Sequence, residues 1–359
     1  MPNIKIFAQD IEHVALNQIH ALASHPVFMN EKIRIMPDVH AGVGSVIGFT
    51  STFTDKIIPY TIGVDIGCGV IVANIGKTEL NLSSVDRFIK ENIPHGRNEH
   101  KEVKAFFDLS KLKIYDALTN KKHIEKSLGT LGGGNHFIEI GVDSKNDKYL
   151  MIHTGSRNLG TQVAEYYQKL AINNCLKKDM NLTKDLCYLS GNYCQDYLHD
   201  MNICLKYASL NRLTILTLIL EKYNLKPINV FETIHNYIDI EEKIIRKGAV
   251  SAQRNELLLI PLNMADGSII GHGLGNIDWN CSAPHGAGRV LSRTKAKETL
   301  KLDEFYEKMG NIYSTTVSKK TIDEAPMAYK NSDLILKQIK ETVKIIDIIK
   351  PIYNFKSEH

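Results

Sequence analysis

Five side chains of the kinds that bind transition metals lie beside glycines or at the ends of predicted strands. In the segment PYTIGVDIGCGV, Asp65 and Cys68 stand three residues apart among several glycines. Because glycine allows unusual backbone angles, such a loop can turn both side chains toward one point. His136, His153 and His235 occur in LGGGNHFIEI, MIHTGSRNLG and FETIHNYI, each at a strand end or in the adjacent turn.

This set of one thiolate, one carboxylate and three imidazoles exceeds the four ligands that a single zinc ion takes. Since a thiolate sulfur can bridge two metal ions, the set suits a two-ion site. Two ions about 3.5–4 Å apart can hold both the attacking and the leaving oxygen in phosphoryl transfer. Any one histidine could instead be an ordinary core or surface residue, but the three together favour a metal centre. By ligand softness, a thiolate with imidazoles favours zinc or another late metal.

A further histidine stands in the small-residue segment SAPHGAGRVLSR. Gly286, Ala287 and Gly288 would let a phosphate approach backbone N–H groups, and a helix beginning there would add its positive end. Arg289 could hold a phosphate through its planar guanidinium. A neutral His285 is a competent nucleophile toward phosphorus, with a sixth metal ligand or a general acid as the alternatives.

Two other segments carry weaker signals. The glycine-rich stretch from Asn263 to Asn276, which contains Ser268, matches neither the P-loop nor the dinucleotide fingerprint. It predicts either a phosphate-binding loop or an ordinary turn. Arg246 and Lys247 in RKGAV could contact RNA phosphates, or could form a solvated surface.

The elements that must position these residues alternate between β-like and helical patterns. Stretches rich in valine and isoleucine that stop at tight turns predict strands, namely VIGFTSTF, VIVANI, FIEIG, YLMIHTGS, INVFETIHNYI and LLLIPLNM. Helical spacing predicts helices over about 160–178 and 192–223, and an amphipathic helix over 332–349 that Pro351 stops. The mixture predicts an α+β class, with one domain over 1–359 and a helical insertion at about 160–225.

Charge, hydrophobic content and cysteine usage limit the classes of protein to which this chain can belong. The 359 residues include 44 Lys and Arg against 40 Asp and Glu, so the net charge is +4 and any nucleic-acid contact needs local clusters of basic residues. With 43% hydrophobic residues the chain is typical of globular proteins. We expect no secretory leader and no membrane span, because the longest aliphatic stretch covers only about 213–220. The six cysteines form no CxxC pair, which favours free thiols in a cytoplasmic protein.

Seven segments resemble the motifs of the RtcB family of RNA ligases. They are MPDVHAGVG, VDIGCG, LGGGNHFIEI, HTGSRN, IHNY, HGAGRVLSR and DEAPMAYK, in the family's order between about Met36 and Lys356. The resemblance implies an α+β fold with mixed and antiparallel sheets around a deep metal-lined cleft. It also implies joining of an RNA 2′,3′-cyclic phosphate or 3′-phosphate end to a 5′-hydroxyl end, with GTP and two Mn²⁺ ions. Ligand softness pointed to zinc; we follow the resemblance and treat zinc as a competing ion.

The resemblance further implies roles for individual residues. Two ions would be held, with Cys68 bridging, by Asp65, Cys68, His136, His153 and His235. His285 would attack the α-phosphorus of GTP and form a GMP–histidine. Positions similar to the family's guanylate contacts are Asn135, His136, Phe137, Glu139, His235, Asn236, Asp266, Gly267, Ser268, His285, Gly286, Ala287, Gly288 and Lys356. Positions expected to contact RNA or phosphate are Arg157, Arg246, Lys247 and Arg289.

Other features complete the sequence-based expectation. Asp38 and His40 are expected to support the cleft, and Glu139 to accept the guanine N1–H and amino group. The segment Asp266–Ile270 departs from the Pro-Gly-Ser-Met-Gly loop usual in the family. An archease-like activator is a candidate partner. The alternative functions are a two-metal RNA end-healing phosphodiesterase or phosphatase that needs no GTP, and a non-catalytic RNA-binding repair scaffold.

Overall fold

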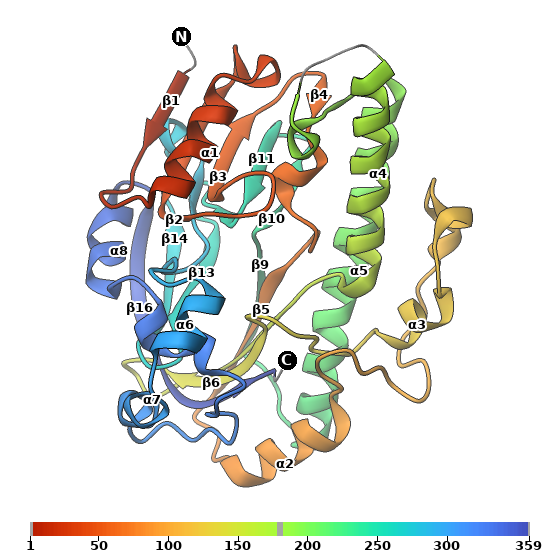
Figure 1. The fold of residues 1–359 in the computed structure, drawn as a ribbon. Helices are drawn as coiled ribbons and strands as arrows, with labels where there is room; N and C mark the ends of the chain where they lie inside the picture. The colour runs from red at the N-terminus through yellow and green to blue at the C-terminus, as the bar shows by residue number, and fades with distance from the viewer. Residues whose placement is uncertain (1–2, 178–181, 358–359) are drawn as a thin grey trace.

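A seven-stranded antiparallel sheet forms the centre of the computed structural model, which describes residues 3–177 and 182–357 (Figure 1). Its strand order is β13-β14-β16-β6-β7-β5-β9. The strands are β5 (Gly69–Gly76), β6 (Phe137–Val142), β7 (Lys148–Thr154), β9 (Asn229–Ile234), β13 (Leu257–Asn263), β14 (Gly267–Gly273) and β16 (Val343–Lys356). The two outer strands meet, since the Leu259 N–H donates to Thr233 Oγ1 at 3.2 Å, so the sheet curls round on itself.

A second sheet of five strands lies beside the first. Its order is β1-β2-β3-β11-β10, with bounds β1 (Asn3–Ile6), β2 (Lys32–His40), β3 (Ile47–Thr52), β11 (Ile244–Lys247) and β10 (Asn236–Asp239). Two short pairs join β12 (Ala249–Ser251) to β15 (Ser282–Pro284) and β4 (Lys56–Ile57) to β8 (Leu189–Ser190). Only His235 separates β9 from β10, so this residue stands at the junction of the two sheets.

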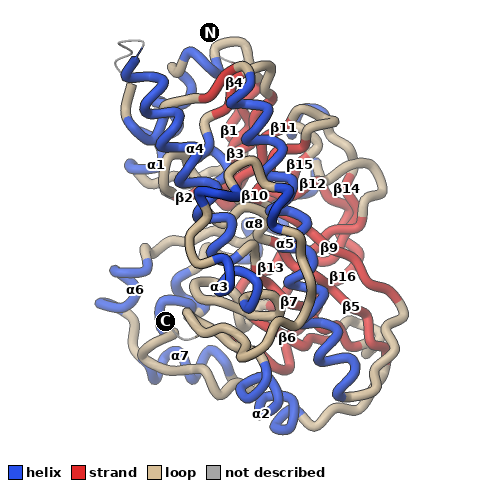
Figure 2. The backbone as a smooth tube through the Cα atoms, turned by 90° about the vertical axis from the view of Figure 1, so that its right-hand side faces the viewer, coloured by secondary structure: helices blue, strands red, loops and turns tan. Residues whose placement is uncertain are grey.

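Two long helices, α4 (Arg157–Lys177) and α5 (Asn192–Lys222), pack together, and α5 packs against β5 and β7 (Figures 1 and 2). In α5 the buried residues recur every three or four positions, as Tyr197, Met201, Cys204 and Ala208 illustrate. By length and composition α5 could span a membrane, but half of its most apolar stretch is buried inside the fold, as in a core helix. The predicted helices over 160–178 and 192–223 are therefore confirmed where the structure describes them.

The remaining helices are short. They are α1 (His13–Ala23), α2 (Leu82–Asn92), α3 (Lys121–Lys126), α6 (Arg293–Thr299), α7 (Leu302–Met309) and α8 (Ser332–Gln338). Five of the six stretches predicted as strands form a single strand each, and the sixth, INVFETIHNYI, forms two, β9 and β10, which His235 separates. The mixture of helices with antiparallel sheets confirms the predicted α+β class.

The helix predicted over 332–349 is wrong beyond its first turns. Helix α8 ends at Gln338, and β16 then begins at Val343 and runs through Pro351 to Lys356. Proline has no N–H to donate to a neighbouring strand. It is tolerated here because the register with β6 shifts between Pro351 and Tyr353, as at a β-bulge. Isoleucine-rich sequence also packs well on a sheet.

The stretch from Asn263 to Asn276, predicted as a loop or turn, is mostly a β-hairpin. Strand β13 ends at Asn263 and β14 begins at Gly267, so only three residues form the turn. Glycine is needed at position 273, where a Cβ would lie 2.3 Å from the backbone of Ala252. The glycines of this stretch therefore allow neighbouring backbone segments to pack closely.

Candidate metal and nucleotide site

Sheet register brings four segments of the chain to one point. Strand β5 pairs with both β7 and β9, so that Val70 lies opposite His153 while Gly69 lies opposite Ile234. Cys68 immediately precedes β5, and His235 immediately follows β9. In the same way β6 pairs with β7, and His136 directly precedes β6. Residues far apart in sequence thus meet because they flank the ends of adjacent strands.

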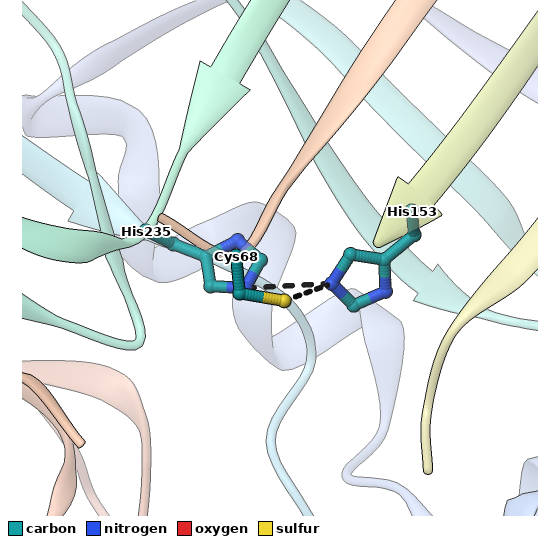
Figure 3. Close-up of side chains that lie close together, drawn as sticks. All are labelled: Cys68, His153 and His235. Atoms are coloured by element: carbon teal, nitrogen blue, oxygen red, sulfur yellow. Dashed lines mark hydrogen bonds between the residues drawn. The ribbon is translucent and has the colours of Figure 1, made fainter. Parts of the chain in front are cut away.

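The sulfur of Cys68 lies at the centre of this cluster. It is 3.4 Å from His136 Nε2 and 3.3 Å from His153 Nε2. The Nε2 atoms of His153 and His235 are 3.4 Å apart, and Figure 3 shows the Cys68 side chain in front of the His235 ring with its sulfur directed toward His153. Asp65 Oδ2 lies 3.1 Å from His136 Nε2. Two three-residue groups result, Asp65–Cys68–His136 and Cys68–His153–His235, and they share the thiol.

Backbone carbonyls orient two of the three imidazoles. His136 Nδ1 lies 2.8 Å from Leu131 O, and His153 Nδ1 lies 3.2 Å from Asn135 O. Because a carbonyl only accepts, each Nδ1 carries the proton and each Nε2 presents a lone pair to the cluster. This arrangement is typical of histidines that bind metals.

The donor set fits a site for metal ions, and the Cys68 thiol belongs to both three-residue groups. Burial lowers the pKa of His153 and of His235 well below the usual 6.5, so both imidazoles are neutral ligands at physiological pH. Burial alone would raise the pKa of Asp65, but its close contact with His136 and the nearby Arg157 guanidinium lower the pKa overall, which keeps the carboxylate ionised. Its buried Oδ1 has no hydrogen-bond partner among the described residues. Burial raises the pKa of the Cys68 thiol, so metal binding must release a proton.

His285 lies next to the metal cluster and is held in place by Asp38. Its ring centre lies 4.9 Å from that of His235. Asp38, fully buried on β2, accepts hydrogen bonds from His285 Nδ1 at 2.7 Å and from the His285 backbone N–H at 3.2 Å. The approach depends on Gly288, where φ is +76° and a Cβ would lie 2.3 Å from Asp38 O. Asp38 therefore fixes the proton on Nδ1 and leaves the lone pair of the ring on Nε2.

His40 supports the same corner of the site. Its Nδ1 lies 2.9 Å from the Asp38 carbonyl oxygen. Burial lowers the pKa of His40 to about 4, so its ring is neutral near pH 7. His40 and Asp38 thus occupy the supporting places that the sequence predicted.

A cavity of about 320 Å³ extends from the metal cluster past His285. Its far wall comes from the pairing of β6 with β16, which sets Glu139 opposite Asn354 and Phe137 opposite Lys356. Glu139 Oε2 accepts a hydrogen bond from Asn354 Nδ2 at 2.6 Å, whereas Oε1 has no partner among the described residues. Burial raises the pKa of Glu139 to about 7. The cavity therefore ends in a carboxyl group that needs donors from a ligand.

Several cations beside the cavity converge on Glu324. Lys356 Nζ lies 3.0 Å from Glu324 Oε2, and Arg289 and Arg293 lie 3.3 Å and 3.0 Å from Oε1. Burial would raise the pKa of Glu324, but Lys356 and both arginines lower it to about 2, so the carboxylate stays charged. Tyr329 also donates its hydroxyl to Glu324. These contacts hold the basic side chains at the cavity wall.

Most residues predicted as guanylate contacts line this cavity. They are Asn135, Phe137, Glu139, His235, Asn236, Ser268, His285, Gly286, Ala287, Gly288 and Lys356, and Arg289 of the predicted phosphate contacts joins them. His136 instead faces a separate groove that also contains Arg157. Asp266 and Gly267 are not among the cavity-lining residues; Asp266 accepts from Asn263 Nδ2 at 2.8 Å and from the Ser332 hydroxyl. These two positions therefore shape the β13–β14 turn.

The basic pair in RKGAV is buried and bonded within the protein. Arg246 is 0% exposed and donates to Ser282 Oγ at 2.9 Å and to the Tyr237 hydroxyl at 2.9 Å. Lys247 Nζ donates to Ser45 O at 2.9 Å and to Tyr60 O at 3.2 Å. Burial lowers the pKa of Lys247 to about 7. We assign neither side chain to RNA.

Three residues of the site were missed at the sequence level: Glu324, Tyr329 and Asn354. Glu324 and Tyr329 belong to DEAPMAYK, where an acidic pair followed by small residues and a tyrosine is unusual enough to signal a role. Asn354 lies in the segment predicted partly as helix, and only the β16–β6 register places it beside Glu139.

A cluster of side chains that could hold metal ions lies beside the half-buried His285 and a cavity of about 320 Å³. The family model described as "tRNA-splicing ligase RtcB" matches residues 18–117 and 109–357 of the chain. The chain therefore belongs to the RtcB family.

Individual relatives match over nearly their full lengths. "RNA-splicing ligase RtcB" of Escherichia coli strain K12 is 34% identical over 389 aligned positions, covering 95% of this chain and 94% of the relative. "tRNA-splicing ligase RtcB" of Nanoarchaeum equitans is 29% identical, covering 89% of this chain and 86% of the relative. "RNA-splicing ligase RtcB2" of E. coli strain ATCC 25922 is 25% identical over 97% of this chain.

Proposed function

We propose that this protein is a GTP-dependent RNA ligase that joins a 2′,3′-cyclic phosphate or 3′-phosphate end to a 5′-hydroxyl end. Membership of the RtcB family supports the reaction class. The observation that carries the mechanism is the position of His285, whose Nδ1 is bound by Asp38 and whose ring lies 4.9 Å from the His235 ring of the metal cluster. A nucleophile so placed can reach a phosphate held at the metals.

The first step transfers guanylate to the protein. Nε2 of neutral His285 attacks the α-phosphorus of GTP, a bond from nitrogen to phosphorus forms, and the bond to pyrophosphate breaks with its electron pair. The imidazole then carries a positive charge, which the Asp38 carboxylate balances from 2.7 Å. Asp38 is thus a positioning residue that also stabilises the intermediate electrostatically.

The next steps move guanylate to RNA and then release it. A cyclic end is first opened by water to a 3′-phosphate. An oxygen of that phosphate attacks the guanylate phosphorus, the bond to His285 breaks, and the electron pair returns to the imidazole. The 5′-hydroxyl oxygen then attacks the RNA 3′-phosphorus, GMP leaves, and the hydroxyl proton passes to solvent.

Glu139 is the residue that we propose reads the base. An ionised carboxylate can accept both the N1–H and the amino group of guanine, and Glu139 Oε1 is buried without a partner among the described residues. Adenine presents no such donor pair to that carboxylate. Ser268, whose buried hydroxyl also has no partner there, lines the same cavity.

The metal cluster would hold two Mn²⁺ ions through Asp65, Cys68, His136, His153 and His235. When bound, the two ions neutralise charge on phosphate oxygens. The thiolate and imidazole donors also suit zinc, so we propose that Zn²⁺ competes for the same site.

We further propose that the protein acts in the cytoplasm on cleaved RNA, with an archease-like protein as a candidate activator.

The proposed function is tested by incubating the protein with α-³²P-GTP and Mn²⁺ and then denaturing it. We expect acid-labile label on the wild-type protein and none on His285→Ala. Label that is absent from the wild type, together with opening of a cyclic phosphate that never depends on GTP, would instead support an end-healing phosphodiesterase. RNA binding without either activity would support a non-catalytic scaffold.

A further inference from the structure

Two adjacent residues of helix α5, Asn211 and Arg212, donate or accept hydrogen bonds at the backbone of the segments that carry the metal ligands. We call them the α5 pair. Both side chains are 0% exposed, and neither is a metal ligand. Because successive residues of a helix point about 100° apart, the two side chains reach different segments of the chain.

Asn211 holds the loop that leads to His136. Its Oδ1 accepts hydrogen bonds from the backbone N–H groups of Gly129 at 2.7 Å and Thr130 at 3.1 Å, and its Nδ2 donates to Thr130 O at 3.1 Å. The carbonyl oxygen of the next residue, Leu131, lies 2.8 Å from His136 Nδ1. Asn211 therefore fixes the stretch of backbone on which the orientation of this imidazole depends.

The Asn211 amide also reaches the segment that follows His153. Its Nδ2 donates a hydrogen bond to Gly155 O at 3.1 Å. Gly155 packs directly against Asp65, since a Cβ on this glycine would lie 2.2 Å from Asp65 Oδ1. A shift of the Gly155 backbone would therefore change the position of the Asp65 carboxylate in the cluster.

Arg212 joins the two segments that carry the central ligands of the cluster. Its Nη1 donates hydrogen bonds to Gly67 O and to Thr154 O, both at 2.7 Å. Gly67 directly precedes Cys68, and Thr154 directly follows His153. Arg212 thus sets the separation of the two segments on which Cys68 Sγ and His153 Nε2 lie 3.3 Å apart.

The strand before His235 is held by the same guanidinium group. Arg212 Nε donates to Glu232 Oε1 on β9, three residues before His235. The Ser209 hydroxyl, also on α5, donates to Glu232 Oε2 at 2.9 Å. An arginine suits this place because its planar group offers several N–H donors in fixed directions, which an ammonium group does not. One buried side chain therefore connects the ends of β5, β7 and β9 at the cluster.

We propose that Asn211 and Arg212 are positioning residues for the metal site, which hold the ligand-bearing segments at the spacing that two ions require. This inference rests on the metal site of the proposed function. The α5 pair acts through the backbone beside the ligands, so its loss should weaken metal binding without removing a ligand. Groups that orient metal ligands typically contribute about 10–100-fold to metal affinity.

The test compares two buried polar residues of the same helix. Asn211→Ala removes an acceptor for two backbone N–H groups of the loop before the cluster. Asp200→Ala is the matched control, because Asp200 is also 0% exposed on α5. It accepts from the backbone N–H groups of Lys113 at 2.8 Å and Ile114 at 3.2 Å, in a loop that carries no metal ligand. Arg212→Lys, which keeps the positive charge but not the planar group, is the second variant.

Metal binding and stability are measured separately on each metal-free variant. Calorimetric titration gives the Mn²⁺ affinity, the absorption of the Co²⁺-loaded protein reports bonding to the thiolate, and denaturant unfolding gives the stability. We expect Asn211→Ala and Arg212→Lys to bind Mn²⁺ about 10–100-fold more weakly than the wild type, with altered Co²⁺ spectra. Their labelling by GTP should recover as the Mn²⁺ concentration is raised. Asp200→Ala should lose as much stability as Asn211→Ala but bind Mn²⁺ with wild-type affinity.

Two outcomes would overturn the inference. Wild-type Mn²⁺ affinity in a destabilised Asn211→Ala would show that this residue serves the fold alone, and if that variant does not fold, wild-type affinity in Arg212→Lys leads to the same conclusion. An equal loss of Mn²⁺ affinity in Asp200→Ala would show that metal binding merely follows the stability of the fold. A wild-type protein that binds Mn²⁺ but takes no label from GTP would instead refute the proposed ligation mechanism, and the expected difference in Mn²⁺ affinity between the variants would still support the role of the α5 pair.

Discussion

The metal cluster and the nucleotide cavity adjoin each other but are completed in different ways. At the cluster, backbone carbonyls of Leu131 and Asn135 already hold the outer nitrogens of two histidines. In the cavity, Glu139 Oε1 and Ser268 Oγ are buried without partners among the described residues. The protein itself therefore orients these two metal ligands. Because buried polar atoms are nearly always hydrogen-bonded, the two cavity atoms depend on a ligand for their hydrogen bonds. Substitutions in the two regions should therefore affect different properties, namely metal binding at the cluster and nucleotide binding in the cavity.

The largest effect is expected from Cys68→Ala. Because the thiol belongs to both three-residue groups, its loss should weaken both metal sites and slow guanylylation by about 10²–10³-fold, since metal charge stabilisation is worth several kcal/mol. Equilibrium dialysis with Mn²⁺ and labelling with GTP measure the two effects. Cys281→Ala, at a cysteine outside the cluster, is the control. Two ions bound at wild-type affinity in Cys68→Ala would show that sulfur is not a shared ligand.

A smaller but still large effect is expected from Asp38→Asn. The amide cannot balance the charge on a guanylylated His285, so labelling should slow by about 10²-fold or more. Mn²⁺ affinity should stay at the wild-type value, because Asp38 contacts His285 and not the five metal ligands. A parallel loss of metal binding and labelling would mean that the two regions cannot be separated.

Glu139→Gln should act on the nucleotide alone. Replacing an ionised acceptor by an amide should raise the KM for GTP about 10–100-fold, in line with 1.5–3 kcal/mol for a hydrogen bond to a charged group. Discrimination against ATP should fall as well. Labelling measured at saturating GTP should recover much of its rate, and a variant that does not recover would place Glu139 in the chemistry.

The pH dependence of GTP binding follows from the same residue. The pKa of Glu139 is raised to about 7 by burial, so the carboxyl is protonated below pH 7 and cannot accept both guanine donors. GTP affinity should therefore decrease as the pH falls from 8 to 6, with a proton released on binding at pH 6. Calorimetry in two buffers of different ionisation enthalpy detects that proton. Glu139→Gln should lack both effects.

The smallest effects should separate two neighbours in the β13–β14 hairpin. Ser268→Ala removes a cavity hydroxyl and should raise the KM for GTP about fivefold, the size of one neutral hydrogen bond. Asp266→Ala should leave that KM unchanged and reduce the free energy of unfolding by about 1 kcal/mol through lost turn hydrogen bonds. A shift in KM for Asp266→Ala would place this residue in the nucleotide site after all.

Local patterns were sufficient to predict five of the seven strands of the central sheet and both long helices. Alternating or continuous runs of β-branched residues ended at glycines, and helical spacing of apolar residues was clear in α4 and α5. The pattern failed over 332–349, where isoleucines and lysines fit a helix as well as a strand. Pairing with β6 and β14 decided the outcome, because burial against neighbouring strands outweighs local preference.

The sequence by itself determined which side chains could bind metal or attack phosphorus, because donor chemistry belongs to residue types and their glycine-rich settings. Only the tertiary structure decided that Asp38 orients His285 and that Arg246 is buried and bonded within the protein. Asn354 reached Glu139 through strand register, which no local pattern encodes. Distances between segments remote in sequence are set by packing and register, so these facts appear only when the whole chain is folded.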